Sequence, residues 1–380
     1  MLNKLIPIRE IYSWIGVPFR VCSEYVTKNG IMADKPVFPI NKLNQRVTEK
    51  LSRIITADFL GNINMGLRNE LNLIDEGESM TDSARVDKNP LTGETYVTIS
   101  AAFMQYVWLL TDIALKNIDL AIIQREFTRC GVDYRLYPLI VDTILSMPKE
   151  DVIKLNNLPV GFDIEQYYEY LRRSKSLFDV TAQEQKISQS IMLLARLATK
   201  GEKFTESDFD VIELNGEYEV VVNGAYCYAI AFAMLHELSH FALGHLDMTP
   251  EEQLNETEEE KKRDESNADL NAFWAIFCDL QGQDQFTAVV GVFCLMFALL
   301  MLNPTIEEDH EHPREDKRIF DIYDQVKDEN PKYTVLLVRM FCMWARLFNV
   351  SEFPQVTDDS ENSLNQIREF LKGWKSQEAV

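Results

Sequence analysis

The chain has 380 residues, a length that suits one large domain or two closely packed ones. Its composition, 46% hydrophobic and 26% charged, is that of a globular protein and excludes a disordered or fibrous chain. The formal net charge of −22 repels phosphate backbones, so the sequence predicts no nucleic-acid partner.

The cysteines and the amino terminus indicate the compartment. The six cysteines contain no CxxC pair and stand mostly in apolar surroundings, as reduced cysteines inside cells do. At the amino terminus, Pro7, Arg9 and Glu10 interrupt the apolar run that a secretory signal needs. We therefore expect a cytoplasmic protein.

The first part of the chain is predicted to be irregular and then helical. Residues 1–60 have a mixed pattern and stay unplaced, whereas residues 62–94 are polar and turn-rich, which predicts a long loop. The β-rich stretch Glu94 to Ile99 predicts a strand. Ser100 then caps a predicted helix from Ala101 to about Lys116.

A β-hairpin is predicted further along the chain. The β-rich residues 210–214 and 217–222 flank Asn215-Gly216, a pair that suits a type I′ turn. Residues 218–222 would then form an edge strand with which an extended polypeptide can pair. Because the pattern after Gly224 has the helical period, the sequence predicts a mostly helical α+β fold with one small hairpin.

Two helices are predicted after the acidic residues 251–265. One runs from about Glu265 to Leu280, and the second is the apolar run from Phe286 to Leu302. The second is barely long enough to span a bilayer, and no Lys or Arg between Asp264 and Pro313 anchors it. The sequence therefore predicts a buried core helix and no membrane attachment.

The strongest motif is His236-Glu237-Leu238-Ser239-His240, which lies inside a helical pattern. Histidines at positions i and i+4 project from one face of a helix, so both imidazoles can bind one Zn²⁺. Glu237 lies beside the metal without binding it, where it can act as the general base. Three polar side chains on an apolar helix would otherwise be costly to bury.

A third ligand must complete a catalytic zinc site. The extended metzincin pattern is excluded, because Leu243 and Leu246 stand where it requires glycine and histidine. His245 stands one residue before Leu246, the position at which that pattern requires a third histidine. On a continuing helix it would point away from the two ligands, so we expect it to have a supporting or surface role.

A carboxylate of the following helix is the alternative ligand. Glu265 and Asp269 are four residues apart, so one can bind zinc while the other accepts the ring N–H of a ligand histidine. Most of the neighbouring acids must be solvated. We assign Glu265 as the ligand and Asp269 as its support, with Asp264 as the main alternative to Glu265.

His310, His312 and Arg318 lie in a loop and the helix start that follows it. Attack on an amide creates an oxyanion, which needs a donor beyond the metal. His312 is therefore a candidate catalytic residue, with Arg318 as an alternative donor or a supporting residue. An ordinary surface loop would explain either histidine equally well.

Three segments carry a resemblance to a known family. HELSHFALGH, ESNAD and HPREDKRI resemble the zinc metallopeptidases of the gluzincin type and are similar to the Lit-type phage-exclusion peptidases. The order of the motifs also resembles CAAX prenyl endopeptidases, but those are multi-span membrane enzymes. The resemblance implies zinc ligation by His236, His240 and Glu265, with Glu237 as the base and His312 as a site residue. It also implies bacterial defence by cleavage of a host protein on infection.

The sequence thus predicts a zinc-dependent endopeptidase with a protein substrate and an activating partner or phage trigger. The expected organisation is an unplaced segment 1–60, a metallopeptidase domain 61–330 with its active-site part at 205–325, and C-terminal helices 331–380. A zinc-stabilised binding or sensor protein without turnover and a membrane-attached peptidase are the alternatives.

Overall fold

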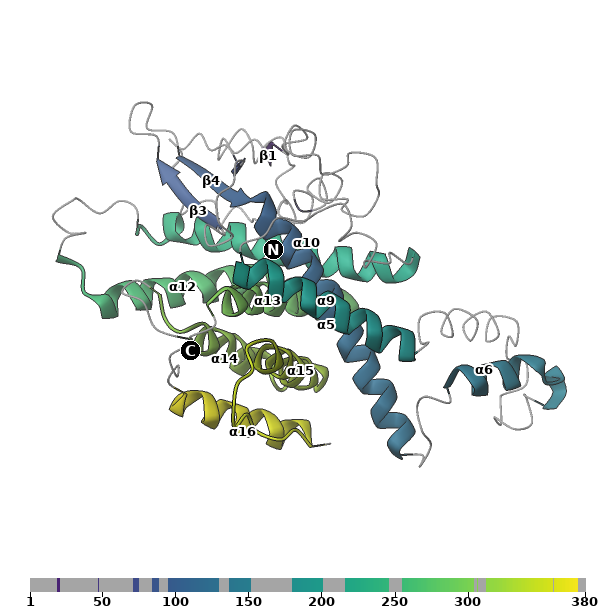
Figure 1. Cartoon of the computed structure of the whole chain (residues 1–380). Helices are drawn as coiled ribbons and strands as arrows, with labels where there is room; N and C mark the ends of the chain where they lie inside the picture. Colours follow the sequence, from purple (N-terminus) through teal and green to yellow (C-terminus); the bar gives the residue numbers. More distant parts are fainter. Residues whose placement is uncertain are drawn as a thin grey trace.

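The computed structural model of the chain describes residues 19–20, 47, 71–74, 84–88, 95–129, 137–151, 180–200, 216–245, 255–303, 306, 312–357 and 359–374. This part is mostly helical, as predicted, and carries one small sheet (Figure 1). Its helices are α5 (Ala101–Arg129), α6 (Tyr137–Ser146), α9 (Val180–Lys200), α10 (Gly216–Ala242), α12 (Glu258–Phe277), α13 (Gly282–Leu302), α14 (Glu315–Val326), α15 (Lys332–Leu347) and α16 (Ser360–Gly373).

The sheet has the order β1-β2-β4-β3, with strands β1 (Phe19–Arg20), β2 (Leu71–Ile74), β3 (Ala84–Lys88) and β4 (Thr95–Ser100). The first two pairings are parallel, and β3 pairs antiparallel with β4. The predicted strand Glu94 to Ile99 is confirmed within one residue at each end. The loop prediction for residues 62–94 is wrong where β2 and β3 form.

The predicted edge strand before the histidine motif is wrong. Residues 216–222 are the first two turns of α10, and residues 210–215 of the predicted hairpin lie outside the described part. At the end of the β-rich stretch, Val222 is buried in the core and Val221 is partly exposed. Strand propensity is weak and depends on context, and packing on neighbouring helices overrides it here.

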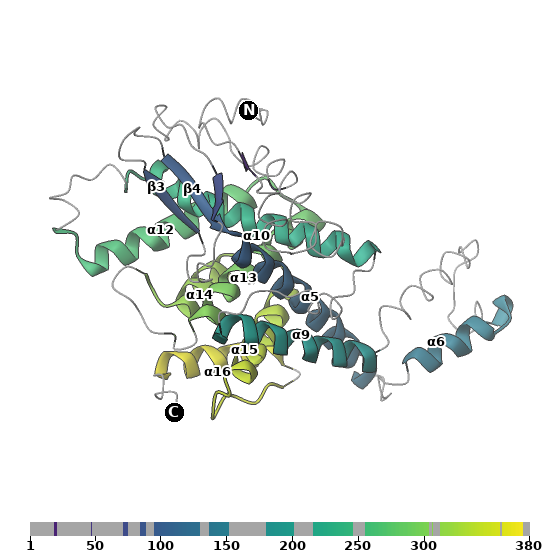
Figure 2. The ribbon, with the colours of Figure 1, turned by 45° about the horizontal axis from the view of Figure 1, so that its top comes forward.

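Helix α10 lies at the centre of the fold, against α5, α12, α13 and the strand β3 (Figures 1 and 2). The buried indole of Trp108 on α5 donates a hydrogen bond of 2.8 Å to Oδ1 of Asn223 on α10. Where α10 packs on α13, Gly291 of α13 faces the backbone of Ala225. The carbonyl oxygen of Ala225 would be 2.2 Å from any Cβ at position 291. The two helices therefore touch backbone to backbone.

Gly291→Ala is expected to destabilise the protein by about 1–3 kcal/mol, because the added methyl group forces α10 and α13 apart. The gain in helix propensity from Gly to Ala, about 1 kcal/mol, is too small to offset this strain. Gly373→Ala is the matched control, since a Cβ at Gly373 meets no atom within 4 Å. Urea denaturation measures both variants, and equal stability of Gly291→Ala and the wild type would contradict the close contact.

Helices α10 and α13 are both apolar enough to be compared with membrane spans. The stretches Val221–His240 and Asp284–Leu302 have the required length and composition, and 78% of the most apolar window of each is buried inside the molecule. The predicted helix over residues 286–302 is confirmed, and its burial is that of a core helix.

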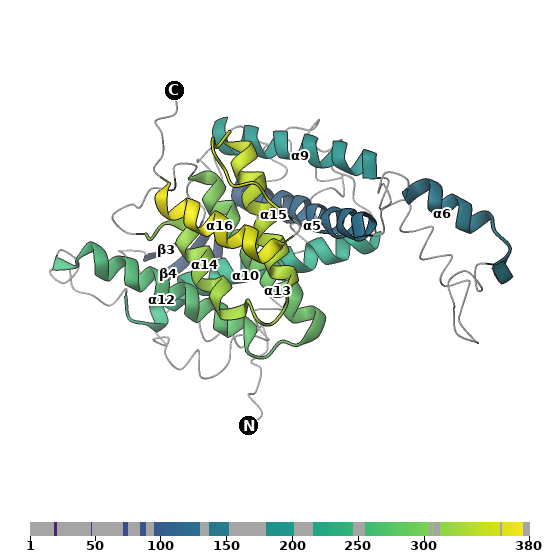
Figure 3. The same cartoon turned by 90° about the horizontal axis from the view of Figure 1, so that it is seen from below.

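The C-terminal helices share this core. Trp344 of α15 is fully buried, and α15 packs against α5 and α13. Helix α16 lies across α14 and α15 when the molecule is seen from below (Figure 3). Arg368 of α16 forms a bidentate ion pair with Asp324 of α14. Arg314, just before α14, donates to the carbonyl of Leu371 at the end of α16. These contacts brace the segment that carries the last part of the site.

Candidate metal centre

Helices α10 and α12 bring the first site residues together. His236, Glu237 and His240 lie near the end of α10, and Glu265 lies on α12 beside it. A hydrogen bond between side chains links the two helices. Asn271 of α12 donates it, at 2.9 Å, to the buried hydroxyl of Ser239 on α10. The hydroxyl in turn donates to the carbonyl of Leu235.

The start of α12 explains how the acidic segment becomes ordered. Thr257 and Glu260 form a capping box, in which the Thr257 hydroxyl accepts from the Glu260 amide and the Glu260 carboxylate accepts from the Thr257 amide. The helix therefore begins seven residues before the predicted start, at Glu258. The acids of its first turn also suit the positive end of the helix dipole.

Three side chains with ligand-type atoms form a close triangle. Nε2 of His236 and Nε2 of His240 are 3.2 Å apart. The Glu265 carboxylate closes the triangle, with Oε2 3.2 Å from His236 and Oε1 3.3 Å from His240. Within the described residues, these three side chains form the group able to hold a metal ion.

The triangle fits a tetrahedral zinc ion. Atoms bound to zinc at about 2.0–2.1 Å in tetrahedral geometry lie about 3.3–3.4 Å apart. This is close to the 3.2 Å between the two nitrogens and to the 3.2 and 3.3 Å between each nitrogen and one of the two Glu265 oxygens. In addition, Oε2 of Glu265 is buried, and its 3.2 Å contact with Nε2 of His236 does not have the geometry of a full hydrogen bond. A buried carboxylate oxygen is costly in this state unless a cation lies against it.

The carboxylate of Asp269 contacts the ring nitrogen of His236 that is not part of the triangle, and the guanidinium of Arg318 contacts Asp269. Nδ1 of His236 is 2.9 Å from Oδ1 of Asp269. Asp269 also accepts two hydrogen bonds from Arg318 of α14, at 2.6 Å from Nε and 2.8 Å from Nη2, and both side chains are buried. Such a partner fixes the ring orientation and the tautomer of a ligand histidine. Asp269 thus contacts His236 and Arg318 contacts Asp269, and their supporting roles stay predictions.

His245 turns back toward the site instead of pointing away from it. The helix ends at Ala242 because Gly244 takes a φ of +79° and the His245 amide bonds to the carbonyl of His240, a Schellman ending. This turn places Nδ1 of His245 2.9 Å from Nδ1 of His240. Asp264 lies 3.6 Å from the far nitrogen of His245, so it is outside the triangle.

The buried side chains create a strongly negative potential. Burial alone would lower the pKa of His236, but contacts with Asp269 and Glu265 raise it to about 10. Burial would raise the pKa of Glu265, but His236, His240 and Arg318 lower it to about 2. The pKa of His240 is lowered to about 4 by burial and by the nearby charge of His236. The carboxylates of Asp269 and Glu265 that raise the pKa of His236 would also attract a divalent cation.

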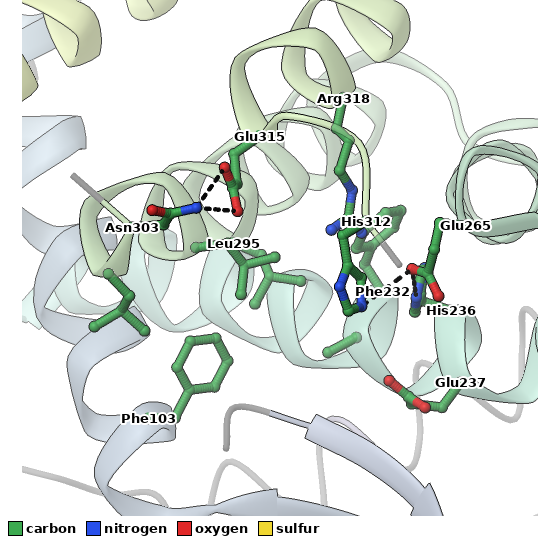
Figure 4. A pocket seen from close by; sticks show the side chains of 13 residues that line it. Phe103, Phe232, His236, Glu237, Glu265, Leu295, Asn303, His312, Glu315 and Arg318 are labelled. Atoms are coloured by element: carbon green, nitrogen blue, oxygen red, sulfur yellow. Dashed lines mark hydrogen bonds and ion pairs between the residues drawn. The ribbon is translucent and has the colours of Figure 1, made fainter. Parts of the chain in front are cut away.

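The triangle opens into a pocket of about 350 Å³ (Figure 4). Glu237 lines it with a side chain that is only 9% exposed, and burial raises the pKa of its carboxyl group. His312 is more open, with Nε2 3.9 Å from Oε2 of Glu265. All eight site residues that the sequence singled out thus meet in one cluster. His310 lies outside the described residues.

The pocket also contains residues that the sequence did not single out. Its apolar wall comes from α5, α10 and α13, and its far end holds Asn303 and Glu315. Glu315 belongs to the HPREDKRI segment, but the motif alone does not show which of its charges face the pocket. The residues of the wall, which look like ordinary core residues in the sequence, are Phe103, Phe232, Leu295, Leu299 and Leu302.

The fold and the triangle together define a helix-borne site that can hold a metal ion beside a buried carboxylate. The sequence model of the family described as Peptidase U49 matches residues 145–337, which are 193 of the 380 residues. The chain therefore belongs to the Peptidase U49 family, and membership makes it a peptidase that acts on protein substrates. No curated protein and no solved structure matches it.

With zinc as the probe metal, Glu265→Ala is expected to lose metal binding, because it removes one corner of the triangle. Asp264→Ala is the matched control and should keep one zinc per chain. Asp269→Asn, which alters only a partner of His236, should weaken zinc affinity about 10- to 100-fold. Metal analysis of the purified variants and competition with a chromophoric chelator measure these effects. Full zinc occupancy in Glu265→Ala would move the ligand role to another residue.

Proposed function

We propose that the protein is a zinc-dependent endopeptidase that cleaves an intracellular protein. The proposal depends chiefly on the triangle of His236, His240 and Glu265 beside the buried Glu237. Membership of a peptidase family supports the same reaction class. In this assignment the three triangle residues hold the metal, and zinc supplies Lewis-acid polarisation of the scissile carbonyl and a lowered pKa for water.

Glu237 is the general base in this proposal. Its carboxylate lines the pocket next to the triangle without belonging to it. The side chain accepts a proton from the attacking water and then donates it to the nitrogen of the leaving amine. Burial raises the pKa of Glu237, which the nearby His236 partly opposes. A raised pKa makes the carboxylate a stronger base toward water. It also means that the protonated form can hold the proton until the leaving amine accepts it.

His312 is the donor proposed for the developing oxyanion. Two nitrogens of Arg318 already donate to Asp269, so this guanidinium is held in place as a support of Asp269. His312 has its ring at the pocket, with a side chain 42% exposed, and its Nε2 approaches the triangle. A ring with this exposure can move onto a substrate carbonyl, and loss of such a donor costs roughly 10²–10³ in rate.

The substrate backbone has a different candidate partner from the one that the sequence indicated. Residues 218–222 are helical and cannot pair with a peptide. Strand β3 is the last strand in the described sheet and contacts α10. We propose β3 as the strand to which an extended substrate adds.

A defence role and a trigger are part of the proposal. They rest on the resemblance of HELSHFALGH, ESNAD and HPREDKRI to the Lit-type phage-exclusion peptidases. A peptidase that acts inside its own cell must be inactive until it is needed, so we propose that an activating partner or a phage component switches it on.

Mapping of new protein N-termini tests the function and the trigger together. Bacterial cells expressing the wild type or Glu237→Gln are compared before and after phage infection. We expect fragments with the wild type that are absent with the variant, and more of them after infection. Identical N-termini in all four samples would refute the endopeptidase proposal, whereas equal cleavage before and after infection would refute the trigger alone.

A further inference from the structure

The second ring nitrogen of His240 lies against another histidine. Nε2 of His240 belongs to the triangle, whereas its Nδ1 lies 2.9 Å from Nδ1 of His245. The two rings are inclined at 66°, with their centroids 5.0 Å apart. The two side chains are only 14% and 13% exposed, so water competes little for this contact. Two ring nitrogens at this distance form a hydrogen bond, in which one carries the proton and the other accepts it.

The direction of this hydrogen bond decides whether His240 can bind a metal ion. A neutral imidazole carries one proton, either on Nδ1 or on Nε2. If Nδ1 of His240 donates, its Nε2 is unprotonated and can bind a metal ion at the triangle. If Nδ1 of His245 donates instead, the proton of His240 lies on Nε2, between His236 and Glu265, where the metal would have to bind.

Asp264 favours the metal-binding arrangement. When Nδ1 of His245 accepts, the proton of that ring lies on Nε2. This nitrogen is 3.6 Å from Oδ2 of Asp264, which is too long for a full hydrogen bond but close enough for the negative charge to attract the proton. The other oxygen of Asp264 is 3.8 Å from the exposed side chain of Arg263, whose charge is screened by water. The carboxylate therefore stabilises the tautomer in which Nδ1 of His245 is the acceptor.

We infer that His245 is a positioning residue, which holds His240 in the tautomer that binds the metal. The inference rests on the proposed function, because it concerns the zinc site of that proposal. Asp269 has the same place at the other ligand histidine, where it contacts Nδ1 of His236. The turn at Gly244, with its φ of +79°, brings the His245 ring back to His240. A helix that continued through this point would have carried the ring away.

The zinc affinity of two matched variants tests this role. Leucine and asparagine have nearly the same shape, but only asparagine offers an oxygen where Nδ1 of His245 stands. His245→Leu is expected to weaken zinc binding about tenfold, the lower end of the range for partners of metal ligands, because the lost acceptor is neutral. His245→Asn should bind zinc nearly as tightly as the wild type. Asp264→Ala leaves the acceptor in place and should keep its zinc.

Competition of the full-length proteins with a chromophoric chelator measures these affinities. Equal affinities in the wild type and His245→Leu, or an equal loss in His245→Leu and His245→Asn, would overturn the inference. Failure of the wild type itself to bind zinc would instead overturn the proposed function.

The tautomer of His245 is a second readout, which a purely structural role would not predict. Nitrogen-15 chemical shifts distinguish protonated from unprotonated ring nitrogens, and the chain has five histidines to label. In the zinc-loaded wild type, the signals that disappear in His245→Asn should show an unprotonated Nδ1 and a protonated Nε2. A proton on Nδ1 of His245 would overturn the inference even if zinc is bound.

Discussion

Glu237→Gln is expected to lower the rate of peptide cleavage by about 10²–10⁴-fold, the usual contribution of a general acid–base side chain. Glutamine has nearly the same shape and can still form hydrogen bonds, but it cannot take a proton from water. Because Glu237 lies outside the triangle of ligand atoms, the variant should keep its zinc and its fold. Kinetics on a peptide that spans the mapped cleavage site, together with metal analysis, measure both properties.

The control for this prediction is a change that touches the same pocket but not the chemistry. Glu315→Gln makes the same chemical change in the same pocket but outside the triangle of ligand side chains, so it should lower the cleavage rate far less than Glu237→Gln. Cleavage by Glu237→Gln within tenfold of the wild type would contradict the base assignment. Loss of zinc in Glu237→Gln would place this side chain in the metal site.

Arg318→Leu is expected to destabilise the protein by about 3 kcal/mol, the lower end of the range for breaking a buried ion pair. Removal of the guanidinium leaves the Asp269 carboxylate buried beside His236 alone. His236 remains as a partner, which is why the upper end of the range is not expected. Urea denaturation of the chelated protein measures the loss without a contribution from metal affinity.

The pair also predicts how this loss depends on pH. Burial would raise the pKa of Asp269, but Arg318 and His236 hold it below the ordinary value. A lowered pKa stabilises the fold above the unfolded pKa of about 4 and ceases to do so as the pH falls. The stability difference between the wild type and Arg318→Leu should therefore shrink below about pH 4.

A double-mutant cycle separates the ion pair from packing. Asp269→Asn combined with Arg318→Leu should be less destabilising than the sum of the two single changes, because no buried charge remains unpaired. Additive losses would show that the two side chains stabilise the fold independently of each other.

The spacing of residues within one helix was enough to predict which side chains of α10 and of α12 share a face. His236 and His240 share a face because they are four residues apart, and the same holds for Glu265 and Asp269 on the next helix. The apolar run that became α13 was also recognisable, since a long uncharged segment forms a core helix in a folded domain. These features depend on helical periodicity, which the local sequence determines.

The relation between segments depended on the tertiary structure. The choice of Glu265 over Asp264 depends on the rotation of α12 against α10, and the link between Arg318 and Asp269 joins residues 49 positions apart. The β-rich residues 216–222 are the first turns of α10, a helix that packs on α13. The pocket also depended on the tertiary structure, because its wall combines side chains of α5, α10 and α13. In the sequence these side chains have the pattern of ordinary core residues. Local propensities differ by about 1 kcal/mol or less per residue, so the contacts between distant segments decide such cases.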